Sequence, residues 1–215
     1  SIVLGRIEER PEGACRLRVR VRTGEPDAAP GPGAASAITL LAAIASRLGG
    51  IRWDSEGNTF LSVSRLEAGA GFGWRASEGV LELEIMSTDA SALEVARRAV
   101  EATIQTTAAE SGLEVHVEDA GSFPPARAEV NAGLAEALRR VYAKLRIRPA
   151  PVSVPDHSAV ISALGIPAVS LGITTGRKTL TEEWVDIAPI ETGFRQVLAL
   201  LEETAPRGAA EGSGG

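Results

Sequence analysis

The chain has 215 residues, a formal net charge of −6 and a hydrophobic content of 44%. This length suits one large or two small domains, and the acidic balance argues against nucleic-acid binding, which needs a basic stripe. The single cysteine, Cys15, excludes an internal disulfide, and no apolar run is long enough for a signal peptide or a membrane span. We therefore expect no nucleic-acid or membrane partner, and a cytoplasmic rather than a secreted protein.

The first half of the chain predicts a β-α-β-β-α-β order. Alternation of apolar and polar residues marks the strands, and apolar residues three and four apart mark the helices. The elements are strand 15–22, helix 34–48, strand 60–66, strand 80–86, helix 89–111 and strand 113–117. A glycine-rich hairpin loop joins the second strand to the third, and Thr88 or Asp89 caps the second helix. This order is typical of a ferredoxin-like domain.

Four arginines alternate with apolar residues along strand 15–22. In a ferredoxin-like sheet the first and third strands are neighbours, so the arginines can pair with Glu82 and Glu84 on the open face. A solvated charged face is the simpler interpretation. A site for an anionic substrate or partner is the alternative.

The rest of the chain predicts a small α/β layer into which the first domain is inserted. Its elements are strand 2–4, helix 128–146, strand 151–154, a helix that ends at Gly165, strand 167–171 and helix 189–203. The predicted domains are residues 1–10 with 121–204, residues 11–120, and a disordered tail over residues 205–215 that is rich in small and polar residues.

The most site-like segment is the loop after strand 167–171, because ligands of open α/β sheets bind at the carboxyl ends of strands. Its candidate substrate-binding residues are Gly172, Thr174, Thr175 and Gly176. Weak catalytic candidates are Asp156 before the short helix and Lys178, Glu182 and Glu183 behind the loop. A helix cap for Asp156 and solvated charges for the two glutamates are the alternatives.

No metal site is predicted within the chain. A zinc hydrolase needs three or four converging nitrogen, oxygen or sulfur ligands and an open position for water. The sequence holds two histidines, His116 in a strand and His157 beside Asp156. Neighbouring residues at a helix start point apart, so Asp156 and His157 do not form a ligand pair.

Two motifs carry a family resemblance. Residues 165–172 read Gly-Ile-Pro-Ala-Val-Ser-Leu-Gly, and residues 178–184 read Lys-Thr-Leu-Thr-Glu-Glu-Trp. Together with the element order, they resemble the zinc metallopeptidase family of aminoacylase, carboxypeptidase G, peptidase T and the acetylornithine and succinyl-diaminopimelate deacylases. In that family the second motif reads His-Thr-Leu-Asp-Glu-Trp and its His binds zinc; here Lys178 or Thr179 takes that place.

The resemblance implies a ferredoxin-like (α+β) lid and dimerisation domain inserted into a small, incomplete α/β three-layer domain. The family's zinc-binding half precedes the lid and has no counterpart in this chain. A family acid before the lid falls in the run Val3-Leu4-Gly5, which lacks it. The resemblance thus predicts no cofactor in this chain, with zinc present only if a partner or a missing N-terminal half supplies its ligands.

Three functions remain open. The first is a non-catalytic subunit that has lost its metal ligands and dimerises, regulates, or binds a peptide or N-acyl amino acid. The second is a fragment or split subunit of an active zinc-dependent peptidase or deacylase, completed by another polypeptide. The third is a different hydrolase with Lys178 as base or anion clamp. We expect a homodimer through the lid, paired along strand 60–66, or a heteromer with a zinc-binding chain.

Overall fold

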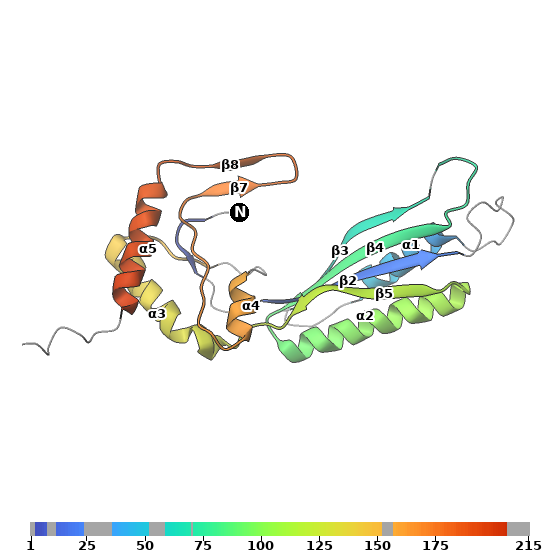
Figure 1. Ribbon diagram of the computed structural model, residues 1–215, viewed down its shortest axis with the longest axis horizontal. Coiled ribbons are helices and arrows are strands. Elements are labelled where there is room, and N and C mark those ends of the chain that lie inside the picture. The colour runs from blue at the N-terminus through green and yellow to red at the C-terminus, as the bar shows by residue number, and fades with distance from the viewer. Residues whose placement is uncertain are drawn as a thin grey trace, which may run out of the picture. The chain divides into compact units, whose positions relative to one another are not determined.

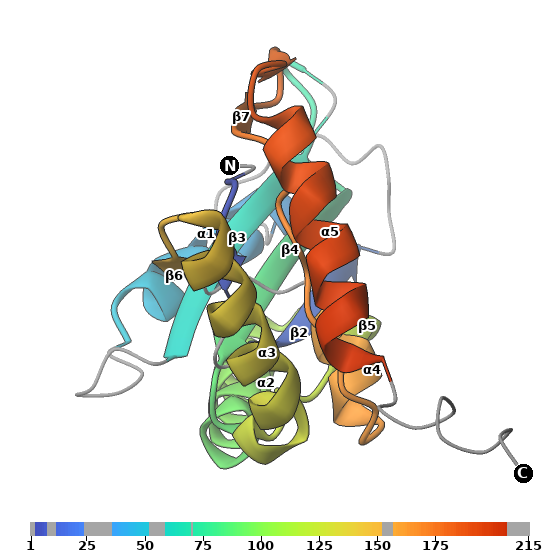
Figure 2. The same ribbon diagram turned by 90° about the vertical axis from the view of Figure 1, so that its left-hand side faces the viewer.

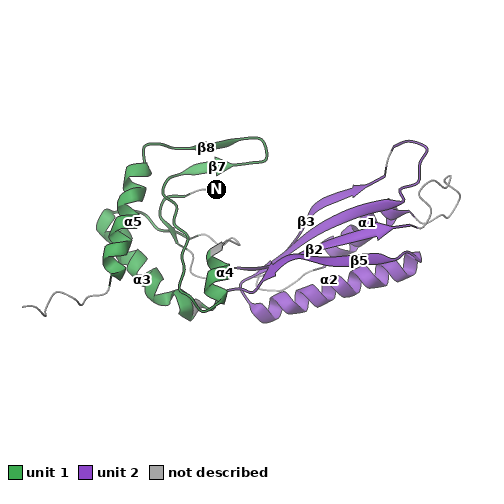
Figure 3. Cartoon of the chain, in the orientation of Figure 1, with its two compact units in different colours: residues 1–11, 126–215 green, residues 12–125 purple. Residues whose placement is uncertain are grey.

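The computed structural model describes residues 3–7, 12–23, 36–51, 59–69, 71–151 and 157–205. The chain divides into two compact units, shown in Figure 3. Unit 2 is Glu12–Pro125, and unit 1 combines Ser1–Pro11 with Ala126–Gly215. Each unit has its own cluster of buried apolar residues. Of the predicted tail, residues 206–215 lie outside the described residues.

Unit 2 is a four-stranded antiparallel sheet with two helices on one face (Figure 1). Its elements are β2 (Gly13–Arg22), α1 (Ala37–Gly49), β3 (Thr59–Ala68), β4 (Glu78–Ser87), α2 (Ala90–Ser111) and β5 (Val115–Phe123). The strand order is β3-β4-β2-β5, so the first and third strands of the unit are neighbours, as the ferredoxin-like pattern predicts.

The core of unit 2 follows from the period of its elements. Every second residue of β2 and β4, such as Leu17, Val19 and Leu83, is buried beneath the helices. The helices bury stripes at helical spacing; Leu41 and Ile44 of α1 are fully buried. Alternation therefore places one face of the sheet in the core and leaves the arginine face open.

Local signals set the ends of α2. Asp89 is the N-cap, and its carboxylate accepts a hydrogen bond from Ala92 N at 2.7 Å. Gly112 ends the helix with φ +68°, in the left-handed region where glycine is favoured. The sequence predicted that the last strand ends at Val117, but β5 runs to Phe123. The strand is longer because it continues to pair with β2 as far as Ala14, past an irregularity in the pairing at Arg16 and Leu17.

Unit 1 is made of short strands and three helices. Its elements are β1 (Arg6–Ile7), α3 (Ala128–Leu145), β6 (Ala150–Pro151), α4 (His157–Ala163), β7 (Gly176–Lys178), β8 (Glu183–Val185) and α5 (Ile190–Thr204). Strands β1 and β6 are a parallel pair, and β7 and β8 are an antiparallel hairpin. Figure 2 shows α3 beside α5, where Arg140 Nε lies 2.7 Å from Glu203 Oε1.

Two predicted strands of unit 1 are wrong. Residues 3–4 of the strand predicted at 2–4 are not a strand, and residue 2 lies outside the described residues. The strand is found at Arg6–Ile7, after a turn at Gly5 (φ +83°), where a Cβ atom would lie 2.3 Å from Arg148 O. Residues 167–171 are not a strand, since no strand pairs with them among the described residues. The strand predicted at 151–154 is found at Ala150–Pro151, and residues 152–154 lie outside the description.

Candidate functional site

The predicted site loop begins at Gly172, where packing requires a glycine. A Cβ atom on Gly172 would lie 1.8 Å from Val3 O, and one on Gly193 of α5 would lie 1.9 Å from Ile173 O. The buried Gln196 side chain of α5 donates from Nε2 to Gly172 O at 3.4 Å. The backbone at 172–173 is therefore held closely between residue 3 and α5, which accounts for both glycines.

The other loop candidates contact the hairpin that follows. The buried Thr174 hydroxyl donates to the backbone oxygen of Asp186, and Asp186 N donates to Thr175 O at 2.8 Å. A Cβ atom on Gly176 would lie 2.6 Å from Trp184 O. The interactions seen at these three positions thus fix the base of the β7–β8 hairpin.

The hairpin brings two of the catalytic candidates together. Lys178 Nζ lies 3.5 Å from Glu183 Oε2, and both side chains are exposed. Glu182 lies in the turn, where its backbone N donates to Thr179 Oγ1 at 2.9 Å. Lys178 thus lies in solvent rather than in the apolar pocket that activates a lysine base. Asp156 is outside the described residues.

Within the part of the chain that the structure describes, no three His, Cys, Asp or Glu residues are grouped as metal ligands. His116 lies on β5 of unit 2, opposite Arg20 in the β2 register. Over the same residues, no helix has the length and apolar character needed to cross a lipid bilayer.

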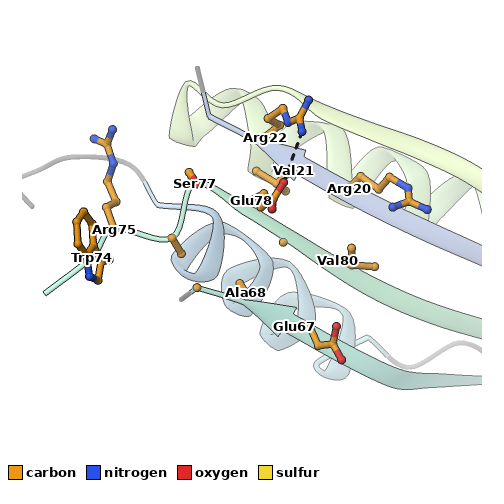
Figure 4. Close-up of a pocket in the computed structure, with 13 residues that line it drawn as sticks. Arg20, Val21, Arg22, Glu67, Ala68, Trp74, Arg75, Ser77, Glu78 and Val80 are labelled. Atoms are coloured by element: carbon orange, nitrogen blue, oxygen red, sulfur yellow. Dashed lines mark ion pairs between the residues drawn. The ribbon is translucent and has the colours of Figure 1, made fainter. Parts of the chain in front are cut away.

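A cavity of about 760 Å³ lies in unit 2, at the end of β2 and beside the loop that joins β3 to β4 (Figure 4). We call it the β3–β4 loop cavity. Its wall includes Arg20 and Arg22 of β2 and the loop residues Trp74 and Arg75. Small residues such as Ala68 and Gly79 form other parts of the wall. This volume is in the range that holds small organic ligands.

The charged groups at the β3–β4 loop cavity differ in how tightly they are paired. Arg22 Nη2 lies 3.7 Å from Glu78 Oε2, and Arg20 Nε lies 3.4 Å from Glu118 Oε2. Glu67 accepts a hydrogen bond from Arg65, which holds the pKa of Glu67 below its usual value. The two β2 arginines thus make only long contacts with their carboxylates, whereas Glu67 is tightly bound.

The rest of the open sheet face is a charged ladder. Arg18 joins Glu82 at 2.8 Å and Glu118 at 3.4 Å, and Arg65 lies 3.7 Å from Glu82. Arg16 pairs with Glu84 at 2.8 Å. The predicted cross-strand pairing of the arginines with Glu82 and Glu84 is confirmed.

Sequence reasoning missed the aromatic part of the β3–β4 loop cavity. The loop carries glycines with positive φ at Gly69, Gly71 and Gly73; Phe72 lies between the last two, Trp74 follows, and both side chains are exposed. The usable signal was the pair of aromatic residues in a turn-forming segment, where solvent exposure of large rings is unusual. The arginines of β2 were predicted to form a solvated charged face, with an anion-binding site as the alternative.

Comparison with solved structures identifies the fold. Over 94% of its length the chain matches aminopeptidase PepT from Bacillus cereus, with a TM-score of 0.72 and 22% identity, and covers 55% of that chain. A hydantoinase/carbamoylase family amidase from Burkholderia vietnamiensis matches 93% of the chain (TM-score 0.72, 14% identity, 49% of that chain covered). A tripeptidase from Staphylococcus aureus also matches 93% (TM-score 0.69, 22% identity, 53% covered).

These likenesses confirm the resemblance predicted from the sequence at the level of fold: an antiparallel four-stranded sheet with its helices and a smaller α/β part. The chain spans about half the length of the solved structures that it resembles. No family model and no curated protein matches the sequence.

Proposed function

We propose that this chain is a non-catalytic assembly and binding subunit with the fold of peptidases and amidohydrolases, and that it works only with further polypeptide covering unit 1. The fold likeness to a peptidase, a tripeptidase and an amidase supports the first part of the proposal. The non-catalytic part of the proposal is supported by Lys178 or Thr179 in the place of the family's zinc-binding His and by the run Val3-Leu4-Gly5, which lacks the family's acid.

The apolar surface of unit 1 carries the proposal. Its buried cluster has seven residues, two of them on β1 and α5 and the rest on or just after α3. The exposed large apolar residues of the same unit are Val160, Ile161, Leu164, Ile166, Ile173, Leu180, Trp184, Val185, Ile187, Ile190, Phe194, Leu198 and Leu201. An apolar surface of this extent marks an interface, because water disfavours it strongly.

Helix α5 shows the interface most clearly. One face packs inward through Gly193, Gln196 and Leu200. A second face presents Ile190, Phe194, Leu198 and Leu201 at helical spacing, and they are 38–61% exposed. A helix with a second apolar face beside its buried one is expected to bury that face too, so a second layer covers α5.

Residues 167–171 supply a backbone edge to the same interface. They follow α4 and include the partly buried Val169 and Leu171, which pack against the unit 1 core. Ala168 N donates to the Asn131 side chain at 2.9 Å, and Ala168 O accepts a hydrogen bond from Ser162 Oγ at 3.5 Å. Residues 167–171 are partly or fully exposed, and we propose that a strand from the covering polypeptide pairs along them.

A second copy of the chain is proposed to pair along β3. This strand lies at the edge of the sheet in unit 2 and exposes Phe60, Val63 and Leu66. A long edge strand with apolar side chains is a ready template for strand pairing. Val63→Lys is expected to convert a dimer into a monomer in light scattering, with Ser62→Lys on the same strand as the control for added charge. An unchanged mass for Val63→Lys excludes β3 pairing.

A second candidate function follows from the same apolar surface: the covering polypeptide carries zinc and the complex hydrolyses a peptide or amide bond. It is favoured by the names of the solved structures, all of which are hydrolases. Because Lys178 or Thr179 stands in the place of the family's zinc-binding His, any such zinc is bound without that ligand.

The deciding experiment is a native mass spectrum of the chain isolated from its own source, read for mass and bound metal. The proposal expects the chain in a complex, with no metal on the chain when it is separated. Zinc on the partner, with amidase or peptidase activity, establishes the second candidate. Stoichiometric zinc on the separated chain, or a well-folded monomer that does not bind a dye for exposed apolar surface, overturns the proposal.

A further inference from the structure

We infer that three cations at the end of α3, Lys144, Arg146 and Arg148, bind an acidic segment of a partner protein. We call these three residues the α3-end basic surface. The inference goes beyond the proposed function, which rests on the apolar surface of unit 1 and makes no use of these cations.

The charge of the chain is distributed unevenly around this surface. Residues 137–155 contain five basic residues and no acidic one. Because the whole chain has a net charge of −6, the residues outside this segment carry −11. A local excess of positive charge in an acidic chain attracts an anionic partner to this place and to few others.

The three cations differ from the two arginines that precede them on α3, which are engaged within unit 1. Arg140 Nε lies 2.7 Å from Glu203 Oε1, and Arg139 Nη1 lies 3.4 Å from Glu136 Oε2. Among the residues that the structure describes, none of the three cations of the α3-end basic surface has an ion pair or a side-chain hydrogen bond. Their charges are therefore available to a partner.

Burial alternates along the segment and places the three cations on its solvent side. Leu145 packs against the core of unit 1 and Ile147 belongs to it, whereas residues 144, 146 and 148 are exposed. Four residues of chain span at most about 14 Å, so one short segment can reach all three cations. An extended acidic peptide matches them, because every second side chain of a strand lies on the same face.

The backbone of Arg146 gives a second, independent observation. Arg146 is the C-cap of α3 with φ +55°, and it is the one non-glycine residue with positive φ in the described part of the chain. Glycine is favoured in this conformation, since a Cβ atom makes it costly. The turn serves to bring Ile147 into the core, and glycine would serve equally. An arginine kept there without an internal partner points to a use for its guanidinium outside the chain.

The dipole of α3 accounts for only part of the surface. Lys144 in the last turn and Arg146 at the C-cap complement the negative end of the helix, but this effect falls off within the last turn and does not extend to Arg148. A long polyanion such as a nucleic acid would meet the net negative charge of the remaining chain. A short acidic segment contacts the basic surface alone, and guanidinium groups bind its carboxylates through paired hydrogen bonds.

The test is fluorescence anisotropy of a labelled peptide of Glu-Gly repeats, titrated with the full chain, beside the same peptide with Gln in place of Glu. The Glu peptide is expected to bind at least ten-fold more tightly than the Gln peptide. Its affinity should fall about five-fold or more between about 50 and 300 mM salt, because exposed ion pairs are screened. Lys144→Gln combined with Arg148→Gln should weaken binding about five-fold or more.

Arg146→Gly separates binding from folding. Glycine suits the left-handed conformation, so this variant should unfold at a higher urea concentration than the unaltered chain. It should nevertheless bind the Glu peptide about three-fold more weakly, whereas Arg146→Lys keeps the charge and should bind as the unaltered chain does. A less stable Arg146→Gly variant, or one with undiminished binding, contradicts the assignment of Arg146 to the surface.

The matched control is Arg127→Gln combined with Arg177→Gln, which removes two exposed cations elsewhere in unit 1. This control should bind the Glu peptide as the unaltered chain does. An equal loss of affinity in the control would show that net charge, not the α3-end basic surface, is responsible. Equal binding of the two peptides, or tighter binding of an oligothymidylate with the same charge as the Glu peptide, also overturns the proposal.

Discussion

The Asn131 side chain connects three segments of unit 1. It is buried on α3, exchanges hydrogen bonds with Ser162 of α4 at 2.9 and 3.1 Å, and accepts one from Ala168 N at 2.9 Å. A buried amide that meets a hydroxyl and a backbone N–H leaves few groups unsatisfied. These hydrogen bonds of Asn131 attach α4 and the segment after it to unit 1, whose apolar core is small.

The Asp89 cap gives a residue-scale prediction. Asp89→Ala removes the hydrogen bond to Ala92 N and is expected to lower the free energy of unfolding by about 1 kcal/mol. Asp89→Asn keeps a side-chain acceptor and should stay within a few tenths of a kcal/mol of the original. Urea denaturation followed by circular dichroism measures both. Equal losses for the two variants would show that charge, not capping, is responsible.

Cys15 gives a pH prediction. Burial raises the pKa of its thiol, and the side chain is 2% exposed in the unit 2 core. The unfolded thiol ionises near its ordinary pKa of about 8.5 while the folded one stays protonated. The contribution of the thiol to stability is therefore complete below the pKa of the unfolded thiol. It is lost as the pH rises through the higher pKa of the folded thiol.

The comparison variant for this effect is Cys15→Ala. Between neutral pH and about pH 10, the unaltered chain should lose more unfolding free energy than Cys15→Ala, because only the former carries the thiol. Urea denaturation at the two pH values gives the difference. Parallel losses in both proteins contradict the assignment of the alkaline slope to Cys15.

At the scale of elements, unit 1 depends on close backbone approach where unit 2 depends on side-chain packing. Helix α5 approaches the backbone at Ile173 so closely that only glycine fits at position 193. In unit 2, by contrast, α1 and α2 fill the space above the sheet with leucine, isoleucine and valine. The two units should therefore respond differently to added volume.

Two helical glycines test this contrast. Gly193→Ala places a Cβ atom 1.9 Å from Ile173 O, and unit 1 should lose about 2 kcal/mol or more. Gly133→Ala on α3 meets nothing within 4 Å and should stabilise the unit by up to about 1 kcal/mol. Hydrogen exchange of α3 and α5 peptides measures both. Matching protection in the two variants would refute the close approach.

At the scale of the molecule, the two units differ in completeness. Unit 2 is a continuous segment, and its core is formed by residues of four strands and two helices. Unit 1 is assembled from both ends of the chain and leaves much of its apolar surface exposed. The first has what an independent domain needs, and the second depends on what covers it.

Residues 12–125 should consequently fold alone. Expressed by themselves, they are expected to unfold cooperatively on heating and to give dispersed amide signals in NMR, because their core lies within the segment. The full chain provides the reference for the same amide signals. A segment without a cooperative transition would mean that unit 1 contributes to the stability of unit 2.

The sequence alone was enough for most of the fold of unit 2. Alternation in β2 and β4 and helical spacing in α1 and α2 encode which face is buried, and these signals are local. The same reasoning placed a strand at residues 167–171, which an apolar run also suggests. A strand exists only with a hydrogen-bonded neighbour, and that neighbour is not encoded within the run itself.

For the candidate site, the sequence identified individual groups and the tertiary structure decided which of them meet. Lys178 and Glu183 were recognised by type, and the hairpin pairs them in solvent; Gly172 was assigned to a ligand, and the structure places Val3 against it. Trp74 and Arg22 are 52 positions apart, and only sheet pairing puts them on one cavity. Periodicity is carried by neighbours in the chain, whereas a cavity depends on contacts between distant segments.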